Sequence, residues 1–378
     1  MKQLIYLDHA ATTKPLPIVL KTYQDVAKQY FANPASPHHV GEVADDLISQ
    51  AKTIFTDYFH IPQDGIIFTS GGTESNHLIL DLVLHQFNGE PIHIITSTVE
   101  HASLYDKCQL LEQQGRLSVT YITPAENGQI TKQQLTKAVQ PDTKLVTIQL
   151  INSETGISQD SEMIGDFCKD HQLLFHTDAV QAFGKQKLSS IFNYVDALSL
   201  SAHKIHGLKG VGALLLKQPK EWRAPFQSKT QAGFRQGTID AGLIASFAVC
   251  VNDYITNKNK RLNTLSRLRH YFISQLKHEQ LPIEVINSDE EGSHIIGCLS
   301  TASYGDYFQQ ALNRKQIYVS TRSACHSNTI GAIRSLIPLY PTEQHQHYFR
   351  ISIGYFTTKS EIDATIFALK NSLETRTL

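Results

Sequence analysis

A lysine, two histidines and three glycines occur in one short stretch at the end of an apolar run. The stretch is Ser199–Gly212, and Lys204 lies near its centre. An amine at the end of a buried strand is desolvated, which lowers its pKa and lets it form a Schiff base with an aldehyde. The hydroxyls beside it, such as that of Ser201, can hold a phosphate. A surface lysine in a glycine-rich turn is the alternative interpretation.

Two further segments carry groups that complement such a lysine. Gly72 and Thr73 lie between an apolar strand pattern and a helical pattern, so backbone N–H groups and the Thr73 hydroxyl can face an anion at the helix N-terminus. Asp178 ends another apolar run, and a buried carboxylate needs a cationic partner. A structural salt bridge would satisfy it, and so would a protonated pyridine nitrogen. Together with Lys204 these residues meet the requirements of pyridoxal 5′-phosphate.

Short apolar runs alternate with helical patterns between residues 60 and 216. This order predicts an α/β fold with a mainly parallel sheet covered by helices on both faces. In such sheets, ligands bind at the carboxyl ends of the strands. The residues that directly follow a predicted strand are therefore expected to share one cleft: Gly72, Thr73, His101, Asn152, Asp178, Ser201, His203 and Lys204.

The pattern changes near residue 252, where a long polar helix is predicted over 252–278 and short strands and helices follow. We therefore expect a large cofactor-binding α/β domain over residues 14–251 and a small α+β domain formed by 1–13 and 252–378. In the small domain, the alternation of 349–353 predicts a strand with Arg350 on one face. An arginine held there can bind a substrate carboxylate with two hydrogen bonds, although an exposed edge-strand charge is the alternative.

Composition excludes several classes of protein. The formal net charge of −1 gives no bulk attraction to nucleic acid or anionic lipid. The N-terminus does not fit a secretory signal and no apolar run is long enough to cross a membrane, so a cytoplasmic location is expected. The five cysteines have no C-x-x-C spacing, which disfavours a disulfide framework or a cysteine-rich zinc site. A weak metal-binding hypothesis at His345 and His347 lacks a third ligand. Neither G-x-G-x-x-G nor a Walker A motif is present.

Ten sequence words, in order and at similar spacing, resemble those of a known family. The chain resembles cysteine desulfurases of the NifS/IscS type, which belong to the class V aminotransferases and to fold-type I pyridoxal phosphate enzymes. The resemblance covers essentially the whole chain. The words are YLDHAATT (6–13), NPAS (33–36), FTSGGTESN (68–76), EH (100–101), NSETG (152–156), HTDAVQ (176–181), SAHK (201–204), RQGT (235–238), SAC (323–325) and RISIG (350–354).

The resemblance implies a role for each matching residue in binding the cofactor. Lys204 would form the Schiff base and move the α-proton, and His101 would stack on the ring and assist proton transfer. The remaining cofactor contacts would be Asp178 to the pyridine nitrogen, Asn152 and Gln181 to the ring oxygen, Gly72, Thr73, Ser201 and His203 at the phosphate, and Thr238 to the phosphate of a neighbouring subunit. A homodimer is therefore implied.

The substrate implied is L-cysteine, whose carboxylate would bind Arg350 with support from Asn33. Cys325, in a polar segment, would attack the substrate sulfur, become a persulfide and release alanine. A sulfur-acceptor protein would take up the sulfur, for iron–sulfur cluster assembly or for thiolation of tRNA or a cofactor. The chain departs from the family pattern at 227–233, at Ala202 and at Arg322.

Two alternatives remain open from the sequence. The first is a related pyridoxal phosphate enzyme, such as a selenocysteine lyase or an aminotransferase, that does not use persulfide chemistry. The second is a non-catalytic scaffold that keeps the fold and takes part in sulfur transfer by binding a partner.

Overall fold

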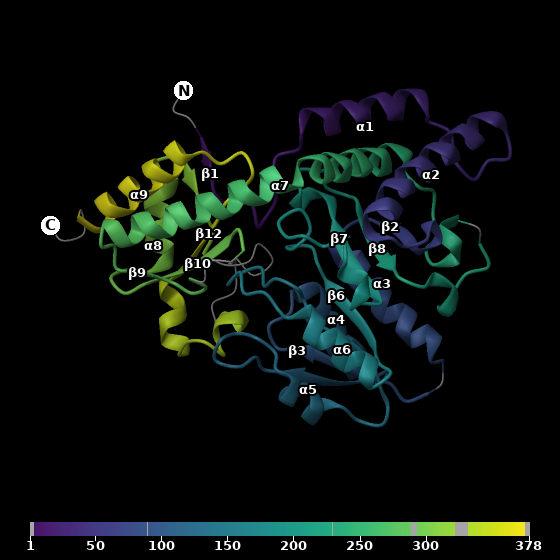
Figure 1. Ribbon diagram of the computed structural model, residues 1–378, viewed down its shortest axis with the longest axis horizontal. Helices are drawn as coiled ribbons and strands as arrows, with labels where there is room; N and C mark the ends of the chain where they lie inside the picture. The colour runs from purple at the N-terminus through teal and green to yellow at the C-terminus, as the bar shows by residue number, and fades with distance from the viewer. Residues whose placement is uncertain (1–3, 89, 229, 289–292, 322–331, 375–378) are drawn as a thin grey trace.

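The computed structural model describes residues 4–88, 90–228, 230–288, 293–321 and 332–374. Within these residues a seven-stranded sheet forms the centre of the larger part of the molecule, in the order β2-β8-β7-β6-β5-β3-β4 (Figure 1). Its strands are β2 (Ile66–Thr69), β3 (His93–Ser97), β4 (Ser118–Ile122), β5 (Thr143–Thr147), β6 (Leu174–Asp178), β7 (Ala197–Ser201) and β8 (Gly212–Leu216).

Strands β4, β3, β5, β6 and β7 pair in parallel, whereas β8 is antiparallel to both β7 and β2. Most residues of the central strands are buried, which explains why these strands are apolar runs without alternation. The predicted α/β fold with a mainly parallel sheet is confirmed. The helices around the sheet are α1 (Pro17–Gln29), α2 (His39–Phe59), α3 (Gly72–Gln86), α4 (Ala102–Gln113), α5 (Lys132–Ala138) and α6 (Ser161–Asp170).

A smaller α+β part contains two further sheets. β10 lies between β9 and β12 and is antiparallel to both, and β1 pairs in parallel with β11. The N-terminal strand thus joins the C-terminal elements, on the left of Figure 1. The elements are β1 (Ile5–Tyr6), β9 (Ile283–Val285), β10 (Ile295–Ser300), α8 (Gly305–Asn313), β11 (Ile317–Tyr318), β12 (Tyr348–Ser352) and α9 (Lys359–Glu374).

The long helix α7 (Ala241–His278) connects the two parts (Figure 1). It begins earlier than the predicted residue 252, because Asp240 caps its N-terminus by accepting a hydrogen bond from the Leu243 N–H. Its first half, through Tyr254, packs in the core of the large sheet, and residues from Leu265 onward pack in the core of the smaller part. The helix therefore runs without a break through the predicted domain boundary at residue 251, and the division into two domains stays a prediction.

Candidate active site

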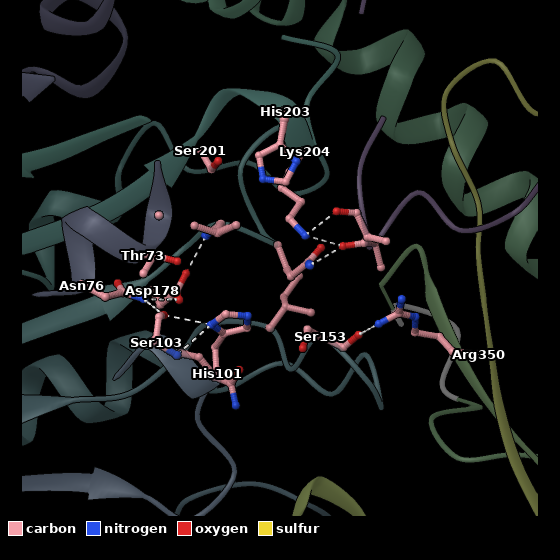
Figure 2. A pocket seen from close by; sticks show the side chains of 17 residues that line it. Thr73, Asn76, His101, Ser103, Ser153, Asp178, Ser201, His203, Lys204 and Arg350 are labelled. Carbon is pink, nitrogen blue, oxygen red and sulfur yellow. Dashed lines mark hydrogen bonds between the residues drawn. The ribbon is translucent and has the colours of Figure 1, made fainter. Parts of the chain in front are cut away.

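A cavity of about 260 Å³ lies at the carboxyl ends of the parallel strands. The predicted site residues that line it are Gly72, Thr73, His101, Asp178, Gln181, Ser201, His203, Lys204 and Arg350. In Figure 2, Thr73, Asn76 and Asp178 lie on one side of the cavity and Arg350 lies on the other. The structure thus brings together residues from β6, β7, α3 and the separate strand β12.

Lys204 follows β7 in a short 3₁₀ turn over Ala202–Lys204. Its Nζ donates hydrogen bonds to the carbonyl oxygens of Ala10 (2.6 Å) and Ala11 (2.9 Å) (Figure 2). His203 is largely buried, and burial followed by the charges of Lys204 and Lys185 lowers its pKa to about 4. The His203 imidazole is therefore neutral at physiological pH.

Asp178 ends β6, and both of its carboxylate oxygens accept hydrogen bonds. Oδ2 accepts from Asn76 Nδ2 at 2.7 Å, and Oδ1 accepts from the Val180 N–H at 2.9 Å. These bonds hold a carboxylate that is only 8% exposed. The Asp178 carboxylate therefore has a fixed position at the cavity wall.

Asn76 and Ser103 were not identified from the sequence, and both line the cavity. Asn76 also donates to Ser103 Oγ at 3.0 Å, and Ser103 Oγ contacts His101 Nδ1 at 2.8 Å. A chain of hydrogen bonds therefore joins Asp178 to His101. The position of Asn76 one helical turn after Gly72, on the same face of α3, is the signal in the sequence that could have indicated it.

The N-terminus of α3 has room for an anion. A Cβ on Gly72 would lie 2.7 Å from Val180 Cγ2 and 3.8 Å from Ser201 Cβ, so a side chain there would crowd the wall. Ser201 Oγ and Gln181 Oε1 are buried and have no hydrogen-bond partner among the described residues. Buried polar atoms are normally paired, so these two call for a polar ligand. Phosphate at the α3 N-terminus and a hydroxyl or ring group near Gln181 fit the atoms present.

Arg350 is 2% exposed and reaches the cavity from β12. Its Nη1 donates to the Ser153 carbonyl at 2.7 Å, and its Nη2 forms an ion pair with Asp8 Oδ1 at 2.7 Å. Nε is buried and has no hydrogen-bond partner among the described residues. The guanidinium is thus held in place at the cavity while one of its donors stays available for a carboxylate.

The structure does not place Asn152, Asn33 or Thr238 in this cavity. The Asn152 amide is already paired, since Oδ1 stabilises its own turn by accepting from the Glu154 and Thr155 N–H groups and Nδ2 donates to the Val99 carbonyl of a distant segment. Asn33 and Thr238 line a second, larger cavity of about 700 Å³. Their predicted roles stay predictions.

Four of the five cysteines lie in the described part of the structure, and all four are buried. Cys108, Cys168, Cys250 and Cys298 are buried, and burial raises the pKa of the Cys108 and Cys250 thiols to about 12. These thiols therefore stay protonated. Cys325 and Arg322 lie outside the described residues. Among the residues that are described, no group of three or more histidine, cysteine or acidic side chains is placed to hold a metal ion.

Comparison with known proteins identifies the family. The model of the family Aminotransferase class-V matches residues 5–365. This chain belongs to the class V aminotransferase family. It is 35% identical to a protein named cysteine desulfurase IscS from Shewanella sp. (strain W3-18-1), over 99% of this chain and 94% of that protein.

Two solved structures support the same assignment. A NifS-like protein superposes with a TM-score of 0.88 and 27% identity, covering 99% of this chain and 100% of that one. A structure described as SspA in complex with cysteine has a TM-score of 0.78 and 28% identity, covering 94% and 100% of the two chains. The NifS-like fold predicted for this class V family member is therefore confirmed. Among its described helices, none is long and apolar enough to cross a membrane.

Proposed function

We propose that this class V family member is a pyridoxal 5′-phosphate-dependent cysteine desulfurase, which converts L-cysteine to L-alanine and passes the sulfur to an acceptor. The observation that carries the proposal is the single cavity that unites Lys204, Asp178, the N-terminus of α3 and Arg350. The relatives named cysteine desulfurase, matched along nearly their whole length, support it.

The residues of the cavity divide between cofactor and substrate. Thr73, Ser201 and the α3 N-terminus would hold the phosphate, and Asp178 would hold the protonated ring nitrogen. When bound, pyridoxal phosphate supplies an electron-accepting ring next to the substrate Cα. His101 would lie against the ring, positioned by its hydrogen bond to Ser103.

Lys204 and Arg350 act on the substrate itself. Arg350 would bind the cysteine carboxylate and so fix the direction of the side chain, as planar guanidinium groups do. The Lys204 amine would take the proton from Cα and return a proton to carbon. Such a transfer requires the amine in its neutral form.

Cys325 would receive the sulfur. Its thiolate attacks the sulfur of bound cysteine, an S–S bond forms and the Cβ–S bond breaks. The electron pair of the broken bond stays with the carbon, which is protonated and leaves as alanine.

Residues before and after Cys325 in the sequence are held near the cavity, which supports the proposal that Cys325 can reach the bound substrate. The backbone of Ser320 pairs with that of Arg350, and Arg334 donates to the Glu100 carbonyl while its guanidinium lies 3.8 Å from the centre of the Tyr105 ring. Cys325 is the fifth residue after Ser320 in the sequence, and five residue steps span at most about 18 Å.

The test is incubation of the purified protein with L-cysteine, with alanine measured and a persulfide sought on Cys325. We expect alanine from the native protein and none from Cys325→Ser, while both keep the visible absorption of the bound cofactor. Lys204→Ala should lose that absorption. Unchanged alanine production by Cys325→Ser would favour a related enzyme of the family instead, and a native protein without visible absorption would favour a scaffold.

A homodimer, a cytoplasmic location and a separate sulfur-acceptor protein are further parts of the proposal. Thr238 and Asn33 line the second cavity together, and Phe31, two residues before Asn33 in the sequence, is 78% exposed. Sedimentation of the purified protein should give a dimer. The variant Thr238→Ala should bind the cofactor more weakly but remain a dimer.

A further inference from the structure

A third, much smaller cavity of about 20 Å³ shares Lys204 with the candidate active site. His9, Lys185 and His294 line it, and we call it the His9–Lys185–His294 cavity. These three residues come from the segment after β1, from the turn after β6 and from the start of β10. None of the three is among the described residues that line the candidate active site.

Several polar atoms of this cavity have no hydrogen-bond partner among the described residues. Both ring nitrogens of His294, Nδ1 of His9 and Nζ of Lys185 are buried and make no hydrogen bond with any described residue. His294 is 3% exposed and His9 is 8% exposed. A neutral imidazole carries one N–H and one acceptor nitrogen, and an ammonium carries three N–H groups, so the cavity presents more donors than acceptors.

The charges around the cavity are all of one sign. Lys185, Lys204 and Arg261 line it, and no carboxylate of the described chain does. Arg261 pairs with Asp253, and Lys204 donates to two carbonyl groups, whereas the Lys185 Nζ is buried and has no hydrogen-bond partner among the described residues. Burial, followed by the charge of Lys204, lowers the pKa of Lys185 to about 7. A positive charge buried in this way is costly unless an anion pairs with it.

The size of the cavity limits what can bind. A single water needs about 10–15 Å³, so the space holds one or two particles of that size and is too small for phosphate or sulfate. A water can accept two hydrogen bonds and carries no charge. A halide ion can accept hydrogen bonds from more donors at once and neutralises Lys185.

We propose that the His9–Lys185–His294 cavity is a binding site for a small monovalent anion of the halide class, with chloride as the ligand. Lys185 provides the charge, and the imidazoles of His9 and His294 provide N–H donors. Lys204 lines both this cavity and the candidate active site. The proposed ion occupies the smaller cavity and is therefore neither cofactor nor substrate.

Thermal unfolding of the purified protein provides the first test. A ligand that binds only the folded state raises Tm with its concentration. At constant ionic strength, replacing sodium gluconate by sodium chloride should therefore raise Tm progressively, and bromide should do the same. In crystals grown with bromide, an anomalous peak is expected between Lys185 and His294. Equal Tm values in gluconate and chloride, or a cavity that holds only water in bromide crystals, would overturn the proposal.

Variants separate this site from general salt effects. Lys185→Met keeps the length of the side chain but removes its charge, and should abolish the difference between chloride and gluconate. Lys52→Met is the matched control, because Lys52 is also largely buried but lines the other large cavity. It should keep the full difference. If Lys185→Met does not fold, His294→Asn serves in its place and should reduce the difference. A full chloride effect in the folded variant contradicts the site.

Discussion

Arg350 is among the largest fully buried side chains of the described structure, and it is charged. Such a residue is stabilised because its two terminal nitrogens are paired: the Asp8 carboxylate balances the charge and the Ser153 carbonyl accepts a second hydrogen bond. The same planar group can bind a substrate carboxylate, and its position depends on both contacts.

Replacement of Arg350 by lysine tests this role at the scale of one residue. A lysine keeps the charge but cannot contact Asp8, Ser153 and a carboxylate in one plane. We expect KM for L-cysteine to rise by about tenfold or more, equivalent to about 1.4 kcal/mol, with a smaller change in kcat. Steady-state kinetics of alanine release measure both. Arg314→Lys, at the exposed end of α8, is the control, and an unchanged KM in Arg350→Lys would rule out carboxylate binding.

At the scale of elements, edge strand β2 leads directly into the Gly72–Thr73 turn. β8 pairs with one side of β2, and on the other side the Gln231 amide takes the place of a strand. Gln231 Nε2 donates to the Phe68 carbonyl at 2.7 Å, and Gln231 Oε1 accepts from the Phe68 N–H at 2.6 Å. Gln231 has a left-handed backbone with φ of 48°, a strained conformation that these contacts stabilise. The departure from the family pattern at 227–233 thus includes a residue that fixes the edge of the sheet.

Gln231→Ala should destabilise both the edge of the sheet and the phosphate-binding turn. Two buried backbone groups of Phe68 lose their partners, which costs on the order of 2 kcal/mol. We expect a lower urea midpoint and weaker binding of pyridoxal phosphate, measured by unfolding curves and by fluorescence titration. Gln218→Ala, on an exposed turn, should change neither quantity. Native-like cofactor affinity in Gln231→Ala would show that the turn holds its shape without this contact.

At the scale of the whole molecule, several histidines are buried in their neutral form. Burial lowers the pKa of His9 and His176 to about 3 and that of His206 to about 4. In the unfolded chain each would titrate near about 6.5. Between these values the unfolded state binds more protons than the folded state, so stability falls as the pH drops from about 6.5 towards 3 to 4.

His176→Gln tests the contribution of one such site. The native histidine is fully buried between Thr147 Oγ1 and Ser199 Oγ. The variant should lose stability near neutral pH but show a shallower dependence between about pH 4 and 6, by up to one proton or about 1.4 kcal/mol per pH unit. Urea unfolding at a series of pH values measures the slope. His39→Gln, on an exposed helix start, should keep the native slope. An unchanged slope in His176→Gln would show that other groups control acid unfolding.

The sequence by itself determined the fold class and most of the cofactor side of the site. Apolar runs separated by helices require a mainly parallel sheet, and the carboxyl ends of parallel strands meet at one edge. Thr73, His101, Asp178 and Lys204 were expected to share a cleft for this reason, and all four line one cavity. This inference needs only local pattern and strand direction.

Only the tertiary structure decided which distant residues join them. Arg350 reaches the cavity because the sheet that contains β12 packs beside the seven-stranded sheet. The alternation of residues within one strand cannot predict such a contact between sheets. The Asn152 side-chain oxygen accepts hydrogen bonds within its own turn, and Asn33 and Thr238 line another cavity. Likewise, His9, Lys185 and His294 are far apart in the chain and look unremarkable there. Packing across the two cores places them around one small space.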